Sequence, residues 1–325
     1  MRLLVLGGTV FVGHAVAAEA LRRGHEVVCA ARGESGGVPA GTTLVAVDRD
    51  RPDGLAELAG ERFDAVVDVA TISYPWVRDA LRVLGPTAPH WTFVSTISVY
   101  ADTDKVTDRV LEPLQEDARG DYTRYGSVKV ASENEVREQL GDRAFIPRPG
   151  LITGPGDRSD RFGYWPGRFA RGGTVLVPAD EGLPAQQIDV RDLAAWIVTA
   201  GENRVTGTHD AIGPIRPLTE TLDEIREITA PAGTEVVPAT SEQLRDNEVG
   251  YWAGPRSLPL WLPAEDGGMM SRDLTPALAA GLTIRPFEDV VRGALSAEER
   301  LGLDRERKSG LSAAQEREVL EKLQA

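Results

Sequence analysis

The stretch YTRYGSVK, residues 122–129, carries the pair of side chains best suited to move a proton. Tyr125 and Lys129 lie four residues apart, so in a helix they share one face. An ammonium near a phenol favours the phenolate, and lowering a tyrosine pKa from about 10 to about 7 takes roughly 4 kcal/mol. We predict that Tyr125 exchanges a proton and that Lys129 lowers the pKa of Tyr125. The alternative is an ordinary polar helix surface.

Three hydroxyl groups follow the apolar residues of FVSTISVY, residues 93–100. Ser95, Thr96 and Ser98 stand at the end of a run typical of a buried strand. Ligands of doubly wound α/β domains bind at the carboxyl ends of the strands. We therefore expect a hydroxyl of this group to hold a substrate oxygen beside Tyr125.

The N-terminal stretch LLVLGGTVFVG, residues 3–13, has the order strand, glycine-rich turn and helix. Gly7 and Gly13 stand where a dinucleotide-binding turn needs its first and last glycines, whereas Val10 occupies the middle place. The amides that open the helix would face the phosphates of the cofactor. An ordinary strand, turn and helix is the alternative. The predicted contacts are Gly7, Thr9, Val10, Phe11, Val12 and Gly13.

The second predicted strand ends in CAARG, with Arg32 where NAD-specific domains place a carboxylate. A guanidinium suits the 2′-phosphate of NADP through a charged, forked contact. We therefore favour NADP(H) as the cofactor, with NAD(H) as the alternative. A solvated loop arginine is the competing interpretation of Arg32. Asp48, which ends the third predicted strand, is a candidate for the adenine side of the pocket.

Alternating strands and helices must position these residues. The strands are continuous apolar runs, which indicates a parallel sheet buried on both faces. We predict an α/β fold, a Rossmann-type doubly wound parallel sheet with a smaller mixed C-terminal substrate domain. The predicted cofactor-binding domain is 1–155, with 185–210 returning to it. Residues 156–325 form the substrate region and end in a charged amphipathic helix. The stretch 154–173 has the composition of a loop or lid.

Composition narrows the class of protein. The 325 residues include 36 basic and 50 acidic side chains, for a net charge of −14, which disfavours nucleic acid as a partner. The sequence has no apolar run near the roughly 20 residues of a membrane span and no signal-peptide pattern, so we expect a cytoplasmic protein without a membrane partner. A homodimer is compatible with these features. One cysteine and four scattered histidines predict no metal site.

Five stretches, taken in order, resemble the extended short-chain dehydrogenase/reductase family, the NAD-dependent epimerase/dehydratase group. They are GGTVFVG, FVSTISVY, YGSVK, RPGLITGPGD and IDVRDLA. The resemblance implies that Tyr125 is the acid/base, that Lys129 also binds the nicotinamide ribose, and that Thr96 takes the catalytic Ser/Thr place. Val10 and Arg32 depart from the usual family pattern. Further along the chain, the predicted cofactor contacts are Val69, Ala70, Ser95, Tyr125, Lys129, Arg148, Pro149 and Gly150.

No motif secures the substrate side. The candidates by position are Thr71, Tyr74, Ser98, Tyr164, Trp165 and Gln187. The favoured function is reduction of a carbonyl group on a small organic substrate by NAD(P)H, with Tyr125, Lys129 and Thr96 assisting. A sugar or nucleotide-sugar epimerase or dehydratase is one alternative. A non-catalytic dinucleotide-binding sensor is the other.

Overall fold

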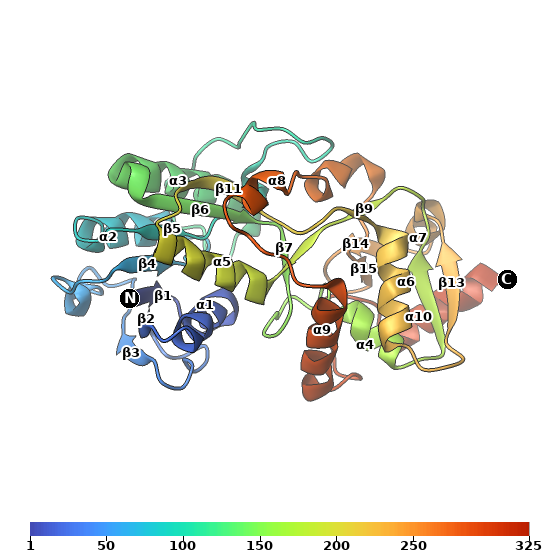
Figure 1. Ribbon diagram of the computed structural model, residues 1–325. Helices are drawn as coiled ribbons and strands as arrows, with labels where there is room; N and C mark the ends of the chain where they lie inside the picture. The colour runs from blue at the N-terminus through green and yellow to red at the C-terminus, as the bar shows by residue number, and fades with distance from the viewer. Residues whose placement is uncertain (325) are drawn as a thin grey trace.

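A seven-stranded parallel sheet organises the N-terminal part of the chain (Figure 1). The computed structural model describes residues 1–324. The strand order is β11-β6-β5-β4-β1-β2-β3, and every neighbouring pair is parallel. This confirms the predicted doubly wound sheet. The strands are β1 Arg2–Leu6, β2 Glu26–Ala31, β3 Thr43–Ala46, β4 Ala65–Asp68, β5 Trp91–Phe93, β6 Ala144–Pro149 and β11 Gly207–Ala211.

Helices cover both faces of this sheet, with α1 and α5 on one face and α2 and α3 on the other (Figure 1). In α1, the residues buried against the sheet are Gly13, Val16, Ala17 and Ala20, a spacing that gives one apolar face. Between β3 and β4 the chain forms only a 3₁₀ turn over Ala56–Leu58. The four helices are α1 Phe11–Arg22, α2 Tyr74–Leu84, α3 Tyr125–Leu140 and α5 Val190–Asn203.

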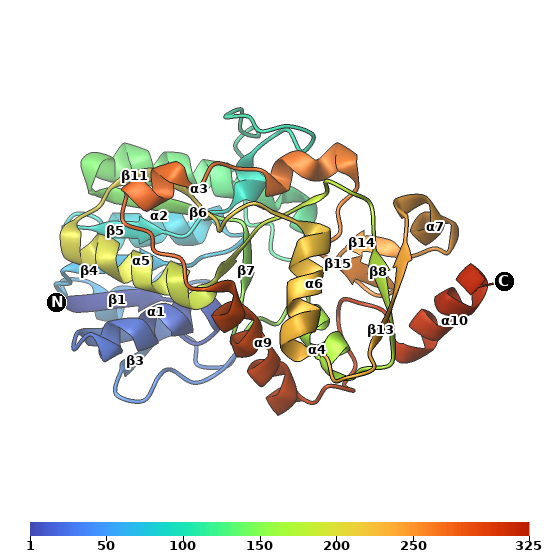
Figure 2. The same ribbon diagram turned by 45° about the vertical axis from the view of Figure 1, so that its right-hand side comes forward.

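A second unit with its own core lies beside the sheet unit (Figure 2). Its helices are α4 Tyr164–Ala170, α6 Leu218–Thr229, α7 Ser241–Asp246, α9 Phe287–Leu301 and α10 Ala313–Gln324. Its strand pairs are β8 Thr174–Pro178 with β13 Glu235–Ala239, β9 Pro184–Ala185 with β12 Arg216–Pro217, and β14 Gly250–Trp252 with β15 Ser257–Pro259. Between the units, β7 Leu151–Thr153 pairs with β10 Gln187–Asp189.

The stretch predicted as a loop or lid is instead part of the second core. Phe162, Trp165 and Phe169 are each at most 1% exposed. The Trp165 indole donates to the carbonyl oxygen of Pro259 at 2.6 Å. Glycines and arginines give the stretch the composition of a loop. The aromatic residues Trp165 and Phe169 are nevertheless four residues apart in α4, so both rings lie on its buried face. The prediction therefore failed because the partners of these rings lie far away in the sequence.

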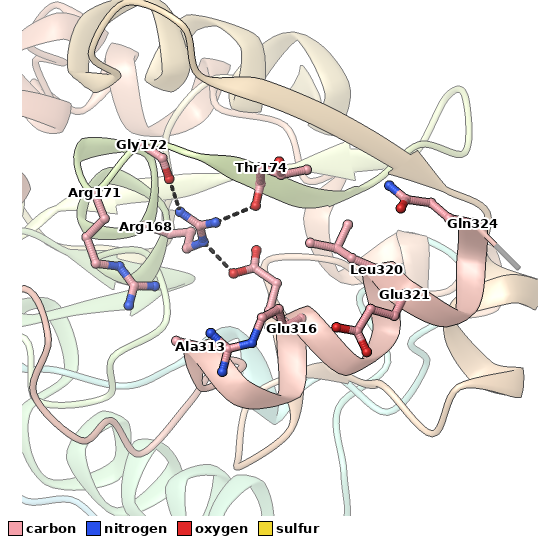
Figure 3. A pocket seen from close by; sticks show the side chains of 10 residues that line it. Arg168, Arg171, Gly172, Thr174, Ala313, Glu316, Leu320, Glu321 and Gln324 are labelled. Atoms are coloured by element: carbon pink, nitrogen blue, oxygen red, sulfur yellow. Dashed lines mark hydrogen bonds and ion pairs between the residues drawn. The ribbon is translucent and has the colours of Figure 1, made fainter.

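A buried ion pair holds α10 against α4 and β8 (Figure 3). Arg168 donates to Glu316 at 2.6 Å and to the carbonyl oxygens of Gly172 and Thr174. Glu316 also accepts the backbone amide of Leu176. Both charges are therefore fully hydrogen-bonded within the core.

The chain passes more than once between the two units. Residues 190–211 form α5 and β11 of the sheet unit. The segment 274–284, which includes α8 Thr275–Ala279, also packs on the sheet unit through Leu274, Ala277 and Leu282. The sequence analysis had placed this segment in the substrate region. Within residues 1–324, no helix combines the length and the apolar character needed to span a bilayer.

Candidate active site

A cavity of about 500 Å³ opens at the carboxyl ends of the central strands, between the two units. It brings together the predicted residues Thr96 and Tyr125 with side chains from distant parts of the chain. The lining residues are Phe11, Thr71, Ser95, Thr96, Ile97, Ser98, Tyr122, Tyr125, Pro149, Gly150, Leu151, Ile152, Arg161, Trp252 and Met269.

Close packing at the start of α3 brings Tyr125 to the hydroxyl groups after β5. A Cβ at Gly126 would overlap the carbonyl oxygen of Ser98, so only glycine permits this approach. The Thr96 hydroxyl accepts the Ser98 amide at 3.1 Å and caps a short 3₁₀ turn over Ile97–Val99. The Thr96 hydroxyl donates to the Ser98 hydroxyl at 3.2 Å, and Thr96 and Tyr125 line the same cavity. Both predicted hydroxyl groups can therefore act on one substrate oxygen.

Lys129 lies one turn further along α3 and is fully buried. Its Nζ donates to the carbonyl oxygens of Ala70 at 2.5 Å and Val94 at 2.6 Å. It stands 4.6 Å from the ring centre of Phe93 and 5.8 Å from that of Tyr125. Burial lowers the pKa of Lys129 to about 7. The lysine therefore sits behind the tyrosine, between two strand ends.

The pKa of Tyr125 is raised, which corrects the expectation that Lys129 would lower it. Burial of the phenol is the largest cause, and the Thr96 hydroxyl and the charge of Arg161 act in the opposite direction on this pKa. The Lys129 ammonium is itself desolvated and bonded to two carbonyl groups. At neutral pH the phenol is therefore a proton donor.

The turn between β1 and α1 fits a pyrophosphate. A Cβ at Gly13 would overlap the carbonyl oxygen of Gly7, so glycine lets the helix pack onto the strand end. No side chain caps the start of α1, and its first turn has no acidic residue. The opening amides and the positive end of the helix dipole are thus available to an anion.

Val10 is compatible with this turn because its backbone is extended, with φ −139° and ψ 150°. A β-branched side chain adopts this conformation without strain. The unusual backbone angle occurs at Phe11, whose φ is 36° and whose ring reaches the active-site cavity. The Val10 side chain faces the loop after β2, because a Cβ placed on Gly36 would lie 3.7 Å from its Cγ1.

Arg32 and Asp48 line a second cavity, of about 410 Å³, at the ends of β2 and β3. The side chain of Arg32 is 46% exposed and lies 3.7 Å from Glu34. Arg51, which the sequence analysis did not single out, lines the same cavity. Four carboxylates, those of Glu34, Asp48, Asp53 and Glu57, share the lining, and Asp53 lies 3.5 Å from Arg51.

Three other predicted cofactor contacts have structural partners of their own. Arg148 binds the buried Glu133 through two hydrogen bonds and donates to the Tyr100 hydroxyl at 2.9 Å. Ser95 donates to Glu133 at 2.5 Å, although it also lines the cavity. The carbonyl of Ala70 is taken by Lys129. Arg148 does not line the cavity, because its guanidinium turns toward Glu133.

The predicted substrate residues divide into two groups. Thr71 and Ser98 line the cavity. Four others do not, which corrects their assignment. Tyr74 is buried and donates to Glu135 at 2.6 Å. Tyr164 and Trp165 belong to the second core, and Gln187 is buried in β10.

Three lining residues, Tyr122, Trp252 and Met269, are not among the site residues predicted from the sequence above. Tyr122 stands three residues before Tyr125, so helical spacing could have indicated it. Met269 and Trp252 reach the cavity from segments more than 120 residues away, for which the sequence offers no local signal. Arg161 lies in the stretch 154–173, whose composition indicated a loop or lid, and only the structure places this side chain in the cavity.

The chain is similar to a family profile and to a known reductase. Residues 3–213 match the profile described as the NAD dependent epimerase/dehydratase family. The 2'-dehydrokanamycin reductase of Streptomyces kanamyceticus is 32% identical over 194 residues, which are 58% of this chain and 52% of that protein. The matched region thus spans about half the length of this relative.

Solved structures share the fold at low identity. A UDP-glucose 4-epimerase superposes with a TM-score of 0.67 at 15% identity, covering 92% of this chain and 98% of that chain. A putative epimerase from Burkholderia cenocepacia gives 0.67 at 21% identity, with coverages of 92% and 98%. The UDP-glucose 4-epimerase of Thermus thermophilus, solved with NAD, gives 0.63 at 19%, with coverages of 92% and 99%.

Proposed function

The chain belongs to the NAD-dependent epimerase/dehydratase family, and from this premise we propose that it reduces a carbonyl group on a small organic substrate with NAD(P)H. The observation that carries the proposal is the shared cavity of Tyr125 and Thr96, with Lys129 one helical turn behind. The reductase name of the Streptomyces kanamyceticus relative supports the same reaction type.

In this mechanism, two hydroxyl groups act on the carbonyl oxygen. When bound, the reduced nicotinamide supplies the hydride that the carbonyl carbon receives. Thr96 donates a hydrogen bond to the oxygen, and Tyr125 transfers its phenolic proton to it as charge develops. Lys129 holds the ends of the neighbouring strands through Ala70 and Val94 and so keeps α3 in place. Solvent then restores the proton on Tyr125.

The raised pKa of Tyr125 is compatible with the role of proton donor that reduction requires. Burial keeps the phenol protonated, which suits the donor role. The proposed cofactor is NADP(H), because Arg32 stands where NAD-specific domains place a carboxylate and its guanidinium suits a 2′-phosphate.

Isotope transfer and stoichiometry test the proposal. Purified protein is incubated with a panel of ketones and aldehydes and with NADPH deuterated at C4. We expect one deuterium on the product carbinol carbon for each NADPH consumed. Acid denaturation of the purified protein should release little nucleotide. Tightly retained NAD⁺ and product formation without net cofactor consumption would instead establish the epimerase alternative.

A further inference from the structure

Arg161 is the cationic group of the active-site cavity. It shares the lining with Tyr125, and no aspartate, glutamate or lysine belongs to that lining. Its Nε donates to the Ser159 hydroxyl at 3.1 Å. Among the contacts of residues 1–324, its two terminal nitrogens have no protein acceptor, and no carboxylate lies within ion-pair distance. The forked end of this guanidinium is thus free to bind a ligand.

The acidic neighbours of Arg161 are engaged elsewhere. Asp160 pairs with Arg305 and accepts the amide of Lys308 at 2.8 Å. Asp157 accepts the amide and hydroxyl of Ser159, at 2.8 and 3.0 Å. Burial lowers the pKa of Arg161, and the charge of Asp157 offsets this only in part. A desolvated cation of this kind is stabilised when an anion binds it.

Trp252 holds the guanidinium toward the cavity. The Arg161 Cζ lies 5.0 Å from the centre of the Trp252 ring. Trp252 has a φ of 66°, a conformation that a bulky residue adopts at some cost and that is often found at functional sites. Stacking on an indole leaves the edge of a guanidinium open for a bidentate contact with an oxyanion.

We propose that the substrate is a carbonyl compound that also carries an oxyanion, a carboxylate or a phosphate, and that Arg161 binds this group. The inference rests on the proposed reduction, because Tyr125 then marks the place of the carbonyl oxygen. Four aromatic side chains line the same space, which suits a flat or apolar body between the two polar groups. These are Phe11, Tyr122, Tyr125 and Trp252.

Binding of ligands that cannot be reduced tests this site separately from the reaction. Calorimetry would compare phenylacetate and phenyl phosphate with the neutral phenylacetamide and the cationic phenethylamine, on protein with and without NADPH. We expect an oxyanion to bind about ten- to hundredfold more tightly than phenylacetamide. The tighter of the two anions identifies the group as carboxylate or phosphate.

Matched variants assign the effect to one side chain. Arg161→Gln should remove the preference for the oxyanion and leave phenylacetamide binding unchanged. Arg161→Lys should retain part of it, because the charge remains but the fork is lost. Arg158→Gln is the control, since Arg158 is exposed three residues earlier and does not line the cavity.

The inference is overturned if the wild-type protein binds acid and amide equally, prefers the amine, or binds none of the probes at millimolar concentration. It is also overturned if Arg158→Gln abolishes the preference as strongly as Arg161→Gln. The wild-type comparison stands even if Arg161→Gln does not fold. Failure of reduction with intact anion binding would reject only the proposed reaction.

Discussion

Three buried ion pairs of the two units join side chains over very different distances in the sequence. In the sheet unit, Glu133 pairs with Arg148 at a separation of 15 residues, and Asp68 pairs with Arg49 at a separation of 19. In the second unit, Arg168 and Glu316 are separated by 148 residues. The first two pairs thus connect neighbouring elements, whereas the third ties the core of the second unit to its C-terminal helix.

The apolar cores differ in the same way. Continuous strands of valine, leucine and alanine fill the sheet unit, and their sequence pattern alone indicates a buried sheet. The second core is built around the aromatic rings of α4, whose partners come from β15, α9 and α10. The local sequence pattern therefore predicts the core of the sheet unit, which is proposed to carry the chemistry. It predicts the core of the second unit, which is proposed to contribute to substrate recognition, much less well.

The largest expected effect is on turnover, and it tests the proposal that the sheet unit supplies the proton donor. Tyr125→Phe removes the proton donor and should lower kcat by about 10²- to 10⁴-fold without weakening cofactor binding. Tyr251→Phe, a control tyrosine that is partly exposed and lies outside the cavity lining, should leave kcat nearly unchanged. Steady-state kinetics and nucleotide titration measure both effects. Near-normal turnover of Tyr125→Phe would mean that the proton comes from another group.

The next effect concerns the long-range ion pair of the second unit. Glu316→Gln leaves Arg168 buried without a counter-charge and should lower the free energy of unfolding by about 3–5 kcal/mol. The control is Glu318→Gln, two residues later on the exposed face of α10, which should have little effect. Urea unfolding followed by circular dichroism measures the difference. Equal stability of the two variants would contradict the structural role given to the buried pair.

The next prediction concerns the preference for NADPH over NADH. It tests whether one residue identified from the local sequence, Arg32, sets this preference in the sheet unit. Arg32→Ala should remove an NADPH preference of about ten- to hundredfold, because a charged hydrogen bond to the 2′-phosphate is lost. Arg22→Ala, on the exposed side of α1 and paired with Glu19, is the control. The ratio of the dissociation constants for NADPH and NADH is the measurement. If the ratio is unchanged in Arg32→Ala, Arg32 does not determine the preference between NADPH and NADH.

The last effect, and the smallest for a single unit of pH, is the pH dependence of stability caused by Lys129. Its pKa is about 7 in the folded protein against a reference value of 10.5, so between these values the unfolded chain binds a proton that the folded chain does not. Stability should therefore rise with pH across this window, by at most about 1.4 kcal/mol per pH unit. Unfolding of wild type and Lys129→Met between pH 7 and 9.5 should show this slope only in wild type. The same slope in both proteins would assign it to other groups.

The sequence predicted the main features of the sheet unit because they depend on spacing within single elements. Four residues separate Tyr125 from Lys129, and the strand before Thr96 ends at the sheet edge where ligands bind. The direction of the Tyr125 pKa shift was wrong, since burial depends on neighbours that the sequence pattern does not reveal. The same limitation explains why Tyr164 and Trp165 were taken for substrate residues.

The sequence by itself determined the parallel sheet, the family and the order in which Gly7, Thr96, Tyr125 and Lys129 occur, because local periodicity and short motifs encode these features. Only the tertiary structure decided which side chains close the cavity. Arg161, Trp252 and Met269 reach Tyr125 from segments separated by many residues, and their approach depends on how the second core packs. Contacts of this kind follow from the burial of distant apolar surfaces against one another, which leaves no signature at any single position in the chain.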